Sequence, residues 1–223
     1  MKYIKKTSEP KFFIIDTKEL IEKLKVATEK SEVWNDDYKE KRKLKEYLLK
    51  NEQNYLCAYC EAKVTLDVSH IEHIKPKSLD YNNLTFDYSN LIVSCNGTCF
   101  SDTNKPRTCG HRKGNKFDED MFLNPTKIKN IRDYFIYTGN YYIGSSNLDK
   151  NKAKYTMDLL ELNSFNNYLP EARKKALDEF RISVKKYALE TGKNVKTVSK
   201  RLLNKENLAF ISFLRFFYRK TLQ

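Results

Sequence analysis

All three histidines and all five cysteines of this 223-residue chain lie between residues 57 and 111, about a quarter of its length. Clustered cysteine and histidine side chains are typical of metal sites. Disulfides are the competing use of cysteine. However, the number of cysteines is odd and the chain lacks the apolar stretch of a signal peptide, so we expect a cytoplasmic protein with reduced thiols. The cluster therefore predicts a metal-centred core.

The cysteines predict a structural zinc site. Two residues separate Cys57 from Cys60, and thiolates at this spacing can both reach one tetrahedral Zn²⁺ at about 2.3 Å. Cys95, Cys99 and Cys109 are the candidates for the closing pair. We favour Cys95 with Cys109, which leaves Cys99 as a spare thiol, and Cys95 with Cys99 is the more compact alternative. Small buried thiols without a metal are the non-functional interpretation.

The segment SHIEHIKPKS, residues 69–78, is the catalytic candidate. In a strand, His70 and Glu72 point to one face, and His73 points to the other face unless the strand ends or bends there. Pro76 helps to end the strand, so His73 can sit at the turn and face a substrate. A neutral imidazole can take a proton from water, and a carboxylate is a hard oxygen ligand for Mg²⁺. For His70, a structural role is as plausible as a supporting one.

The charge balance permits a polyanionic partner. Lys and Arg number 42 against 29 Asp and Glu, which gives a net charge of +13. Such a surplus favours nucleic acid, because each neutralised phosphate releases condensed counterions. A lysine-rich proteome explains the same number without any function. No apolar run approaches the roughly 18 residues of a membrane span, so we expect no membrane partner.

The chain divides into three predicted segments. Residues 1–52 are a helical segment. Residues 53–125 form the core, in which short β-type runs and loops replace helices. Residues 126–223 are a hairpin followed by a helical region.

Two helices are predicted in the first segment. One covers residues 16–31, where Asp16 and Glu19 form a capping-box pattern. The other, which is highly charged, covers residues 36–52. The apolar residues expected to face the core are Leu20, Ile21 and Leu24 in the first helix and Leu44, Tyr47 and Leu48 in the second.

The last segment begins with a predicted hairpin over residues 132–145, turning at the Gly-Asn dipeptide 139–140. Helices are predicted over 151–162 and over 170–192; the second has a proline at its first position and a glycine just past its end. Residues 206–220 are too apolar for an exposed helix. We expect them to pack on the body of the protein or on a partner.

Four motifs together resemble the zinc-knuckle HNH nucleases. They are the Cys57/Cys60 knuckle, residues 72–76 (EHIKP), residues 90–95 (NLIVSC) and residues 109–113 (CGHRK), and their order and spacing match together. The resemblance implies an α+β fold: a zinc-knuckle ββα-metal (HNH) core flanked by N-terminal and C-terminal helices. It implies that Glu72 is a metal ligand and His73 the general base. Asn90 would orient His73 through a backbone or side-chain hydrogen bond.

The last metal ligand departs from the HNH pattern. The common form has Asn or His directly after the fourth cysteine, where Gly110 stands in this chain. His111 is the obvious substitute and Asn115 the second choice. The acidic residue is also Glu rather than the more usual Asp, which is a longer arm with the same chemistry.

Phrases from about residue 45 to 175 resemble a closer family, PtuB, the HNH subunit of the Septu anti-phage system that is also an effector in some retron systems. The resemblance implies an SMC/ABC-like ATPase partner, PtuA, and a nuclease that cleaves DNA in anti-phage defence. It implies catalytic Mg²⁺ or Mn²⁺ beside the structural Zn²⁺. RNA is an alternative target that the sequence leaves open.

Six basic residues near the motifs could grip phosphates, and no element that would read bases is visible. Two other functions explain part of the pattern. A non-catalytic zinc module that binds nucleic acid needs the charge and the cysteines but not Glu72 or His73. A free-standing restriction or homing nuclease needs the site without the ATPase. The six basic residues are Lys75, Lys77, Arg107, Arg112, Lys113 and Lys116.

Overall fold

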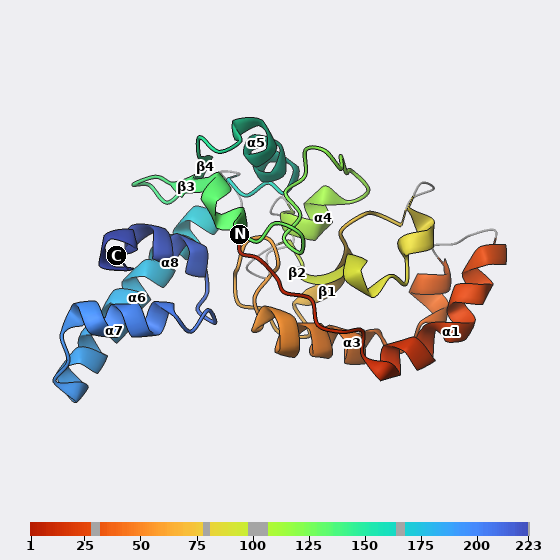
Figure 1. The fold of residues 1–223 in the computed structure, drawn as a ribbon, viewed down its shortest axis with the longest axis horizontal. Helices are drawn as coiled ribbons and strands as arrows, with labels where there is room; N and C mark the ends of the chain where they lie inside the picture. Colours follow the sequence, from red (N-terminus) through yellow and green to blue (C-terminus); the bar gives the residue numbers. More distant parts are fainter. Residues whose placement is uncertain (28–31, 78–80, 98–106, 164–167, 223) are drawn as a thin grey trace.

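The computed structural model describes residues 1–27, 32–77, 81–97, 107–163 and 168–222. Helices are combined with two small antiparallel sheets, so the predicted α+β class is confirmed. Figure 1 shows strands β1 and β2 with helix α4 near the middle of the molecule, helices α1 and α3 to one side, and helices α6, α7 and α8 at the other end. The buried apolar side chains form one cluster with members from Met1 to Leu214. The three-segment division stays a prediction.

The centre of the molecule is a ββα unit. Strand β1 (Ser69–His73) pairs antiparallel with β2 (Leu91–Cys95), and the register places Ser69 opposite Cys95. Every residue of β2 is buried, which explains its unbroken apolar run. Helix α4 (Cys109–Lys113) lies against β2 and ends at Gly114, whose φ of 54° is in the left-handed region. Short 3₁₀ turns, η3 (Asn82–Leu84) and η4 (Tyr88–Asn90), lead into β2.

Helix α1 begins earlier than the sequence predicts. It spans Lys11–Val26, with Pro10 in the capping position, so the predicted start at Asp16 is wrong. Proline fits this position because the first N–H groups of a helix have no intrahelical partner. Residues 28–31, at the predicted end, lie outside the described residues.

The predicted apolar stripe of α1 is confirmed in part. Leu24 is buried and Leu20 partly buried, whereas Ile21 is 38% exposed, and Phe13 and Thr17 complete the buried face. Phe13 sets this orientation, because its ring packs edge-on against Tyr38 at 5.9 Å. A long-range aromatic contact therefore decided the rotation of the helix.

The predicted helix over 36–52 is divided into pieces. A π-helical turn, η1 (Val33–Asp37), comes first, then α3 (Lys41–Leu48), then a second π-turn, η2 (Leu49–Gln53). The break occurs at Tyr38, whose extended backbone turns its buried ring towards Phe13 and Trp34. Leu44 and Leu48 of α3 are buried as predicted, and Tyr47 is partly buried.

The C-terminal elements follow the prediction more closely. A 3₁₀ turn, η5 (Ile131–Tyr134), leads into strand β3 (Phe135–Tyr137), which pairs with β4 (Ile143–Ser145) in the predicted hairpin. The left-handed residue of the turn is Tyr141 rather than the glycine. Helices α5 (Lys150–Leu159) and α6 (Leu169–Thr191) are confirmed, and α6 ends at a left-handed Gly192.

The apolar C-terminal segment packs on the body of the protein. Helix α7 (Val195–Leu203) precedes α8 (Ile211–Phe217) and the short α9 (Arg219–Leu222). Phe213 of α8 contacts Tyr137 of β3, with ring centroids 5.3 Å apart. Ser212 donates from its backbone N, at 2.7 Å, and from its hydroxyl to the carboxylate of Glu61, the residue directly after Cys60. Among the described residues, no helix combines the length and apolarity that a membrane crossing needs.

Candidate functional site

Four cysteine thiols meet at the junction of the central elements. Cys57 and Cys60 come from the knuckle, Cys95 ends β2 and Cys109 begins α4; their sulfur atoms all lie within 4.8 Å of one another and are buried. The Sγ atoms of Cys60 and Cys95 are 3.9 Å apart. That is too long for a disulfide, at about 2.05 Å, and close to the roughly 3.8 Å edge of a tetrahedron with 2.3 Å Zn–S bonds. The cluster can hold a metal such as zinc.

Further contacts hold the thiols in this arrangement. The backbone N of Cys95 donates to the Sγ of Cys57 at 3.3 Å. Hydrogen bonds with the neighbouring thiols, that of Cys57 first, and then burial raise the pKa of Cys109 well above its ordinary value. A dication would reverse this effect, because it binds the thiolate form. The alternative closing residue, Cys99, lies outside the described residues.

Glu72 of β1 points towards the start of α4. Its carboxylate lies 2.9 Å from Lys113 Nζ and 3.4 Å from His70 Nε2, and the Tyr59 hydroxyl donates to it at 3.4 Å. Burial acts to raise the pKa of Glu72, but the hydrogen bond from His70 and the charge of Lys113 lower it below its ordinary value. The carboxylate is therefore held in its charged form, as a metal ligand must be.

Lys113 does not face solvent. Its side chain is 1% exposed, and its ammonium group is paired with Glu72 and donates to the carbonyl of Gly114. The sequence predicts a phosphate contact for this residue. The structure instead makes it the buried counter-charge of Glu72. The sequence alone does not indicate this role, because the two residues are brought together only by the fold.

Gly110 leaves the space that Glu72 and His70 occupy. A Cβ atom built on Gly110 would lie 2.5 Å from Glu72 Oε2 and 2.8 Å from His70 Nε2, distances that real Cβ atoms essentially never show. The position that carries a ligand side chain in the common HNH pattern is thus filled from β1. The glycine and the longer glutamate are two parts of one local arrangement.

His70 and His111 lie against each other beside this carboxylate. Their ring centroids are 4.1 Å apart, and His70 Nδ1 lies 3.3 Å from the Asn96 side-chain oxygen. The other ring nitrogen of His70, Nε2, faces the Glu72 carboxylate at 3.4 Å. The pKa of His111 is lowered to about 4, first by burial and then by electrostatic interactions with His70 and Arg107. His111 is thus neutral at physiological pH, the form that binds metals.

His73 is the last residue of β1 and is 7% exposed. Its Nε2 lies 2.9 Å from the Thr85 carbonyl oxygen. Because a carbonyl only accepts, Nε2 carries the proton and Nδ1 keeps the lone pair. Trp34 packs edge-on against the ring at 4.5 Å, and burial lowers the pKa of His73 to about 4. The imidazole is therefore neutral and can accept a proton at one defined atom.

Asn90 holds the loop that follows His73. Its Oδ1 accepts from the backbone N of Lys75 at 2.8 Å, and its Nδ2 donates to the Lys75 and Leu84 carbonyls at 3.0 and 3.2 Å. No contact between its side chain and the His73 ring is found among the described residues. Asn90 can therefore influence His73 through the backbone that follows it.

These groups face a cleft of about 300 Å³. Of the six basic residues predicted to grip phosphates, Lys77 and Arg107 line it. Lys75 is paired with Glu119, Arg112 pairs with Glu161 at 3.2 Å, and Lys116 is exposed. The lining residues are His70, Ile71, Glu72, His73, Pro76, Lys77, Arg107, Gly110, His111, Gly114 and Asn115.

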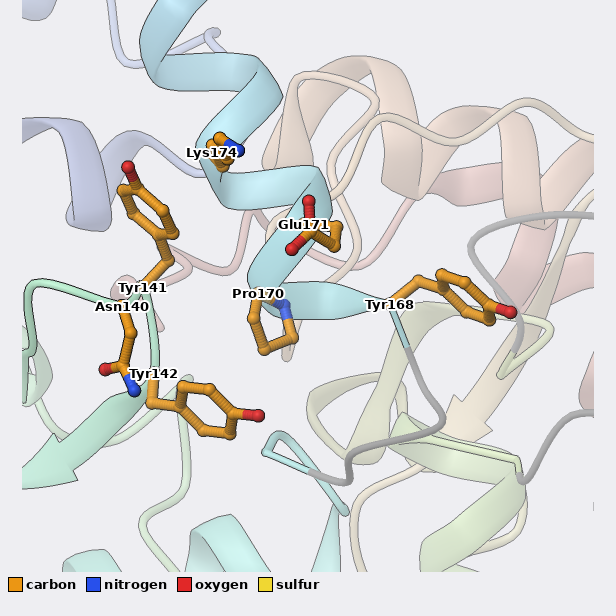
Figure 2. A pocket seen from close by; sticks show the side chains of 7 residues that line it. All are labelled: Asn140, Tyr141, Tyr142, Tyr168, Pro170, Glu171 and Lys174. Atoms are coloured by element: carbon orange, nitrogen blue, oxygen red, sulfur yellow. The ribbon is translucent and has the colours of Figure 1, made fainter.

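A larger pocket, of about 430 Å³, lies between the β3–β4 turn and the start of α6. Three tyrosines line it, and Figure 2 shows Tyr141 and Tyr168 pointing away from each other on either side of Pro170. It contains no histidine or cysteine. The chemistry of the lining residues, rather than pocket size, therefore selects the smaller cleft.

The centre of the molecule has the features expected of an HNH-type core. These are an antiparallel strand pair, a short helix, a four-thiol cluster and a Glu-His pair at the end of the first strand. The chain is 35% identical, over 132 residues, to a Vibrio cholerae (serotype O1 biovar El Tor) protein named "Retron Vc95 putative HNH endonuclease". The match covers 56% of this chain and 60% of that protein. No protein-family model matches the chain. The similarity supports the HNH endonuclease family.

Proposed function

We propose that this chain is a metal-dependent HNH endonuclease that hydrolyses phosphodiester bonds in DNA. The observation that carries the proposal is the end of β1: the charged Glu72 carboxylate and the accepting Nδ1 of His73 belong to adjacent residues that line one cleft. The name of the V. cholerae relative supports the same reaction class. A non-catalytic zinc module would leave this pair without a use.

The residues of the cleft fit a divalent ion. Glu72 offers a carboxylate, His70 and His111 offer imidazole nitrogens beside it, and Asn115 lines the same cleft. Mg²⁺ or Mn²⁺ held there would stabilise the negative charge that develops on the phosphate. Lys113 keeps Glu72 ionised until the ion binds. The four cysteines would hold the structural zinc that joins the knuckle, β2 and α4.

The chain's own residues supply the proton transfer. His73 Nδ1 takes a proton from the attacking water, and the Thr85 carbonyl then stabilises the imidazolium through its hydrogen bond to Nε2. Asn90 holds the backbone that follows His73 through its contacts with Lys75, which would keep the imidazole in the lining of the cleft. Lys77 and Arg107 line the cleft and can neutralise the phosphate.

The test is cleavage of supercoiled plasmid DNA by the purified chain with added Mg²⁺ or Mn²⁺. His73→Ala should abolish cleavage while the zinc content and the circular dichroism spectrum stay unchanged. Lys185→Ala, a change to an exposed basic residue on α6, is the control and should keep most of the activity. Equal cleavage by His73→Ala and the parent would overturn the proposal, and DNA binding without any metal-dependent cleavage would favour the zinc module.

We also propose that the nuclease acts in cytoplasmic anti-phage defence under the control of an SMC/ABC-like ATPase of the PtuA type. The PtuB-like phrases of the sequence and the retron in the relative's name support this setting. Co-purification of the tagged chain from its own cells tests it. An ATPase should be recovered with the chain, and recovery of the chain alone would favour a free-standing nuclease.

A further inference from the structure

A second cleft, of about 470 Å³, adjoins the candidate site. It is built by η1, by the start of α3 and by the start of β1, and it shares His70 and Ile71 with the first cleft. The two hollows are therefore neighbours along β1. The remaining lining residues of the second cleft are Trp34, Asn35, Lys39, Lys41, Arg42, Lys45 and Ser69.

The lining of this second cleft is basic. Four of its residues are Lys or Arg and none is acidic. Within the described ranges, only Arg42 among them pairs with a carboxylate, that of Asp67 at 3.0 Å, and both side chains are exposed. An excess of positive charge in a concave surface attracts polyanions.

Backbone carbonyls fix three of these ammonium groups, and the first is that of Lys39, which donates to the carbonyl of Asp36. Lys41 donates to the carbonyls of Trp34, at 3.1 Å, and Asn35, at 2.5 Å. Lys45 donates to the carbonyls of Leu66 and Ser69. Such contacts orient the ammonium groups without neutralising them. The charges are thus held at defined places before a ligand arrives, which lowers the entropy cost of binding.

The two clefts are also joined through side chains. Lys77, which lines the catalytic cleft, donates to the Asn35 side-chain oxygen at 3.2 Å, and Asn35 lines the second cleft. Burial is the largest cause that lowers the pKa of Lys77, and the positive charge of Lys41 is the next. The two ammonium groups therefore repel each other. A bound phosphate chain would relieve this repulsion.

We propose that the second cleft is a docking groove for the phosphodiester backbone of the substrate, on one side of the bond that is cut. This inference rests on the proposed nuclease function and extends the substrate path along β1. Trp34 is the aromatic residue of the groove, and it is only 5% exposed, so it offers no face on which a base could stack. The groove therefore recognises the charged backbone and is indifferent to sequence.

The test compares the salt dependence of binding. Lys39→Gln/Arg42→Gln changes two exposed residues of the groove. Lys185→Gln/Lys193→Gln removes the same charge from exposed positions on and after α6. Binding of a labelled DNA duplex to the full chain is followed by fluorescence anisotropy without added Mg²⁺, over a range of salt concentrations.

The groove variant should bind more weakly, and the slope of log K against log salt should become shallower by about 0.9 for each lost phosphate contact. The control variant should keep the parent's slope. The inference is overturned if both variants show the same slope, or if the parent does not bind DNA. It is also overturned if the groove variant binds DNA as tightly as the parent.

These outcomes separate the groove from the nuclease proposal. A parent that binds through the groove without cutting refutes only the nuclease proposal. A parent that cuts with an unchanged salt slope in the groove variant refutes only the groove. Arg42→Gln alone, checked by circular dichroism, provides a milder second variant.

Discussion

Gly110→Ala is the most informative single substitution, because it acts on the metal-ligand arrangement through one added methyl group. Gly110 lies in α4 with φ outside the left-handed region, so the backbone accepts alanine without strain. The new Cβ would lie 2.5 Å from Glu72 Oε2, where 3.0 Å is the practical limit. The carboxylate must therefore recede by about 0.5 Å or more, away from its present contacts with His70 and Lys113.

The expected losses follow from this displacement. Misplacing a reacting group by about 1 Å can cost about 100-fold in rate, and a shift of about half that size predicts a cleavage rate about 10- to 100-fold below the parent's. Overpacking a buried site costs about 1 to 3 kcal/mol of folding free energy. The fold should persist, because the chain keeps the rest of its core.

Initial cleavage rates on plasmid DNA, measured beside urea unfolding, test this reasoning. Gly139→Ala is the matched control, since an added Cβ there meets nothing within 4 Å. In the Gly110→Ala background, Glu72→Asp should recover part of the rate, because the shorter side chain vacates the space of the new methyl group. Equal rates for Gly110→Ala and Gly139→Ala would refute the steric argument, as would a double variant slower than both single variants.

Four further predictions concern the surroundings of the site. Cys109→Ser should lower the zinc content measured by atomic emission and make the central unit sensitive to protease, whereas a parent-like zinc content would exclude Cys109 from the site. Glu52→Gln should lower the free energy of unfolding in urea by about 3 to 5 kcal/mol, because Glu52 is buried, pairs with Lys6 at 2.7 Å and accepts from Tyr88 at 2.5 Å; a loss below about 1 kcal/mol would contradict this. Trp34→Ala should cost about 3 to 5 kcal/mol and slow cleavage, since it removes the ring that packs on His73; an unchanged rate would show that this contact does not position the base. The Met1 ammonium group, 3.0 Å away, then Arg132 and then the hydrogen bonds from Ser212 lower the pKa of the buried Glu61 despite its desolvation. The folded chain therefore binds fewer protons than the unfolded chain below about pH 4.5, so the stability supplied by Glu61 is complete above that pH and is lost as the pH falls. Glu61→Gln should flatten the acid limb of a stability-against-pH curve, and an unchanged limb would argue against this linkage.

The sequence predicts the parts of this protein that depend on local rules. Proline and glycine at the two ends of α6 mark its limits, because each fits the backbone geometry of its position. The apolar run before Cys95 predicts a buried strand, and the structure has one there. The spacing of the cysteines predicts which thiols can share a metal, and the structure brings the favoured four together.

Long-range contacts account for what the sequence leaves out. From the sequence, Lys113 is expected to be a surface cation. Only the fold places it against the carboxylate of Glu72, which lies 41 positions earlier in the chain. Nothing near Trp34 in the sequence indicates that it packs on His73. The break at Tyr38 likewise comes from aromatic partners on other elements. Local periodicity carries no information on such pairs.

The contact between Glu61 and α8 has a consequence for the order in which the protein is completed during its synthesis. Glu61 follows the second cysteine of the knuckle and is 1% exposed, and its carboxylate accepts from Ser212, made 151 residues later. A ribosome adds about 5 to 20 residues per second, so the knuckle waits roughly ten to thirty seconds for this partner. During that interval Glu61 lacks the group that covers its carboxylate, and the knuckle is completed only after the helices that precede α8 have been made.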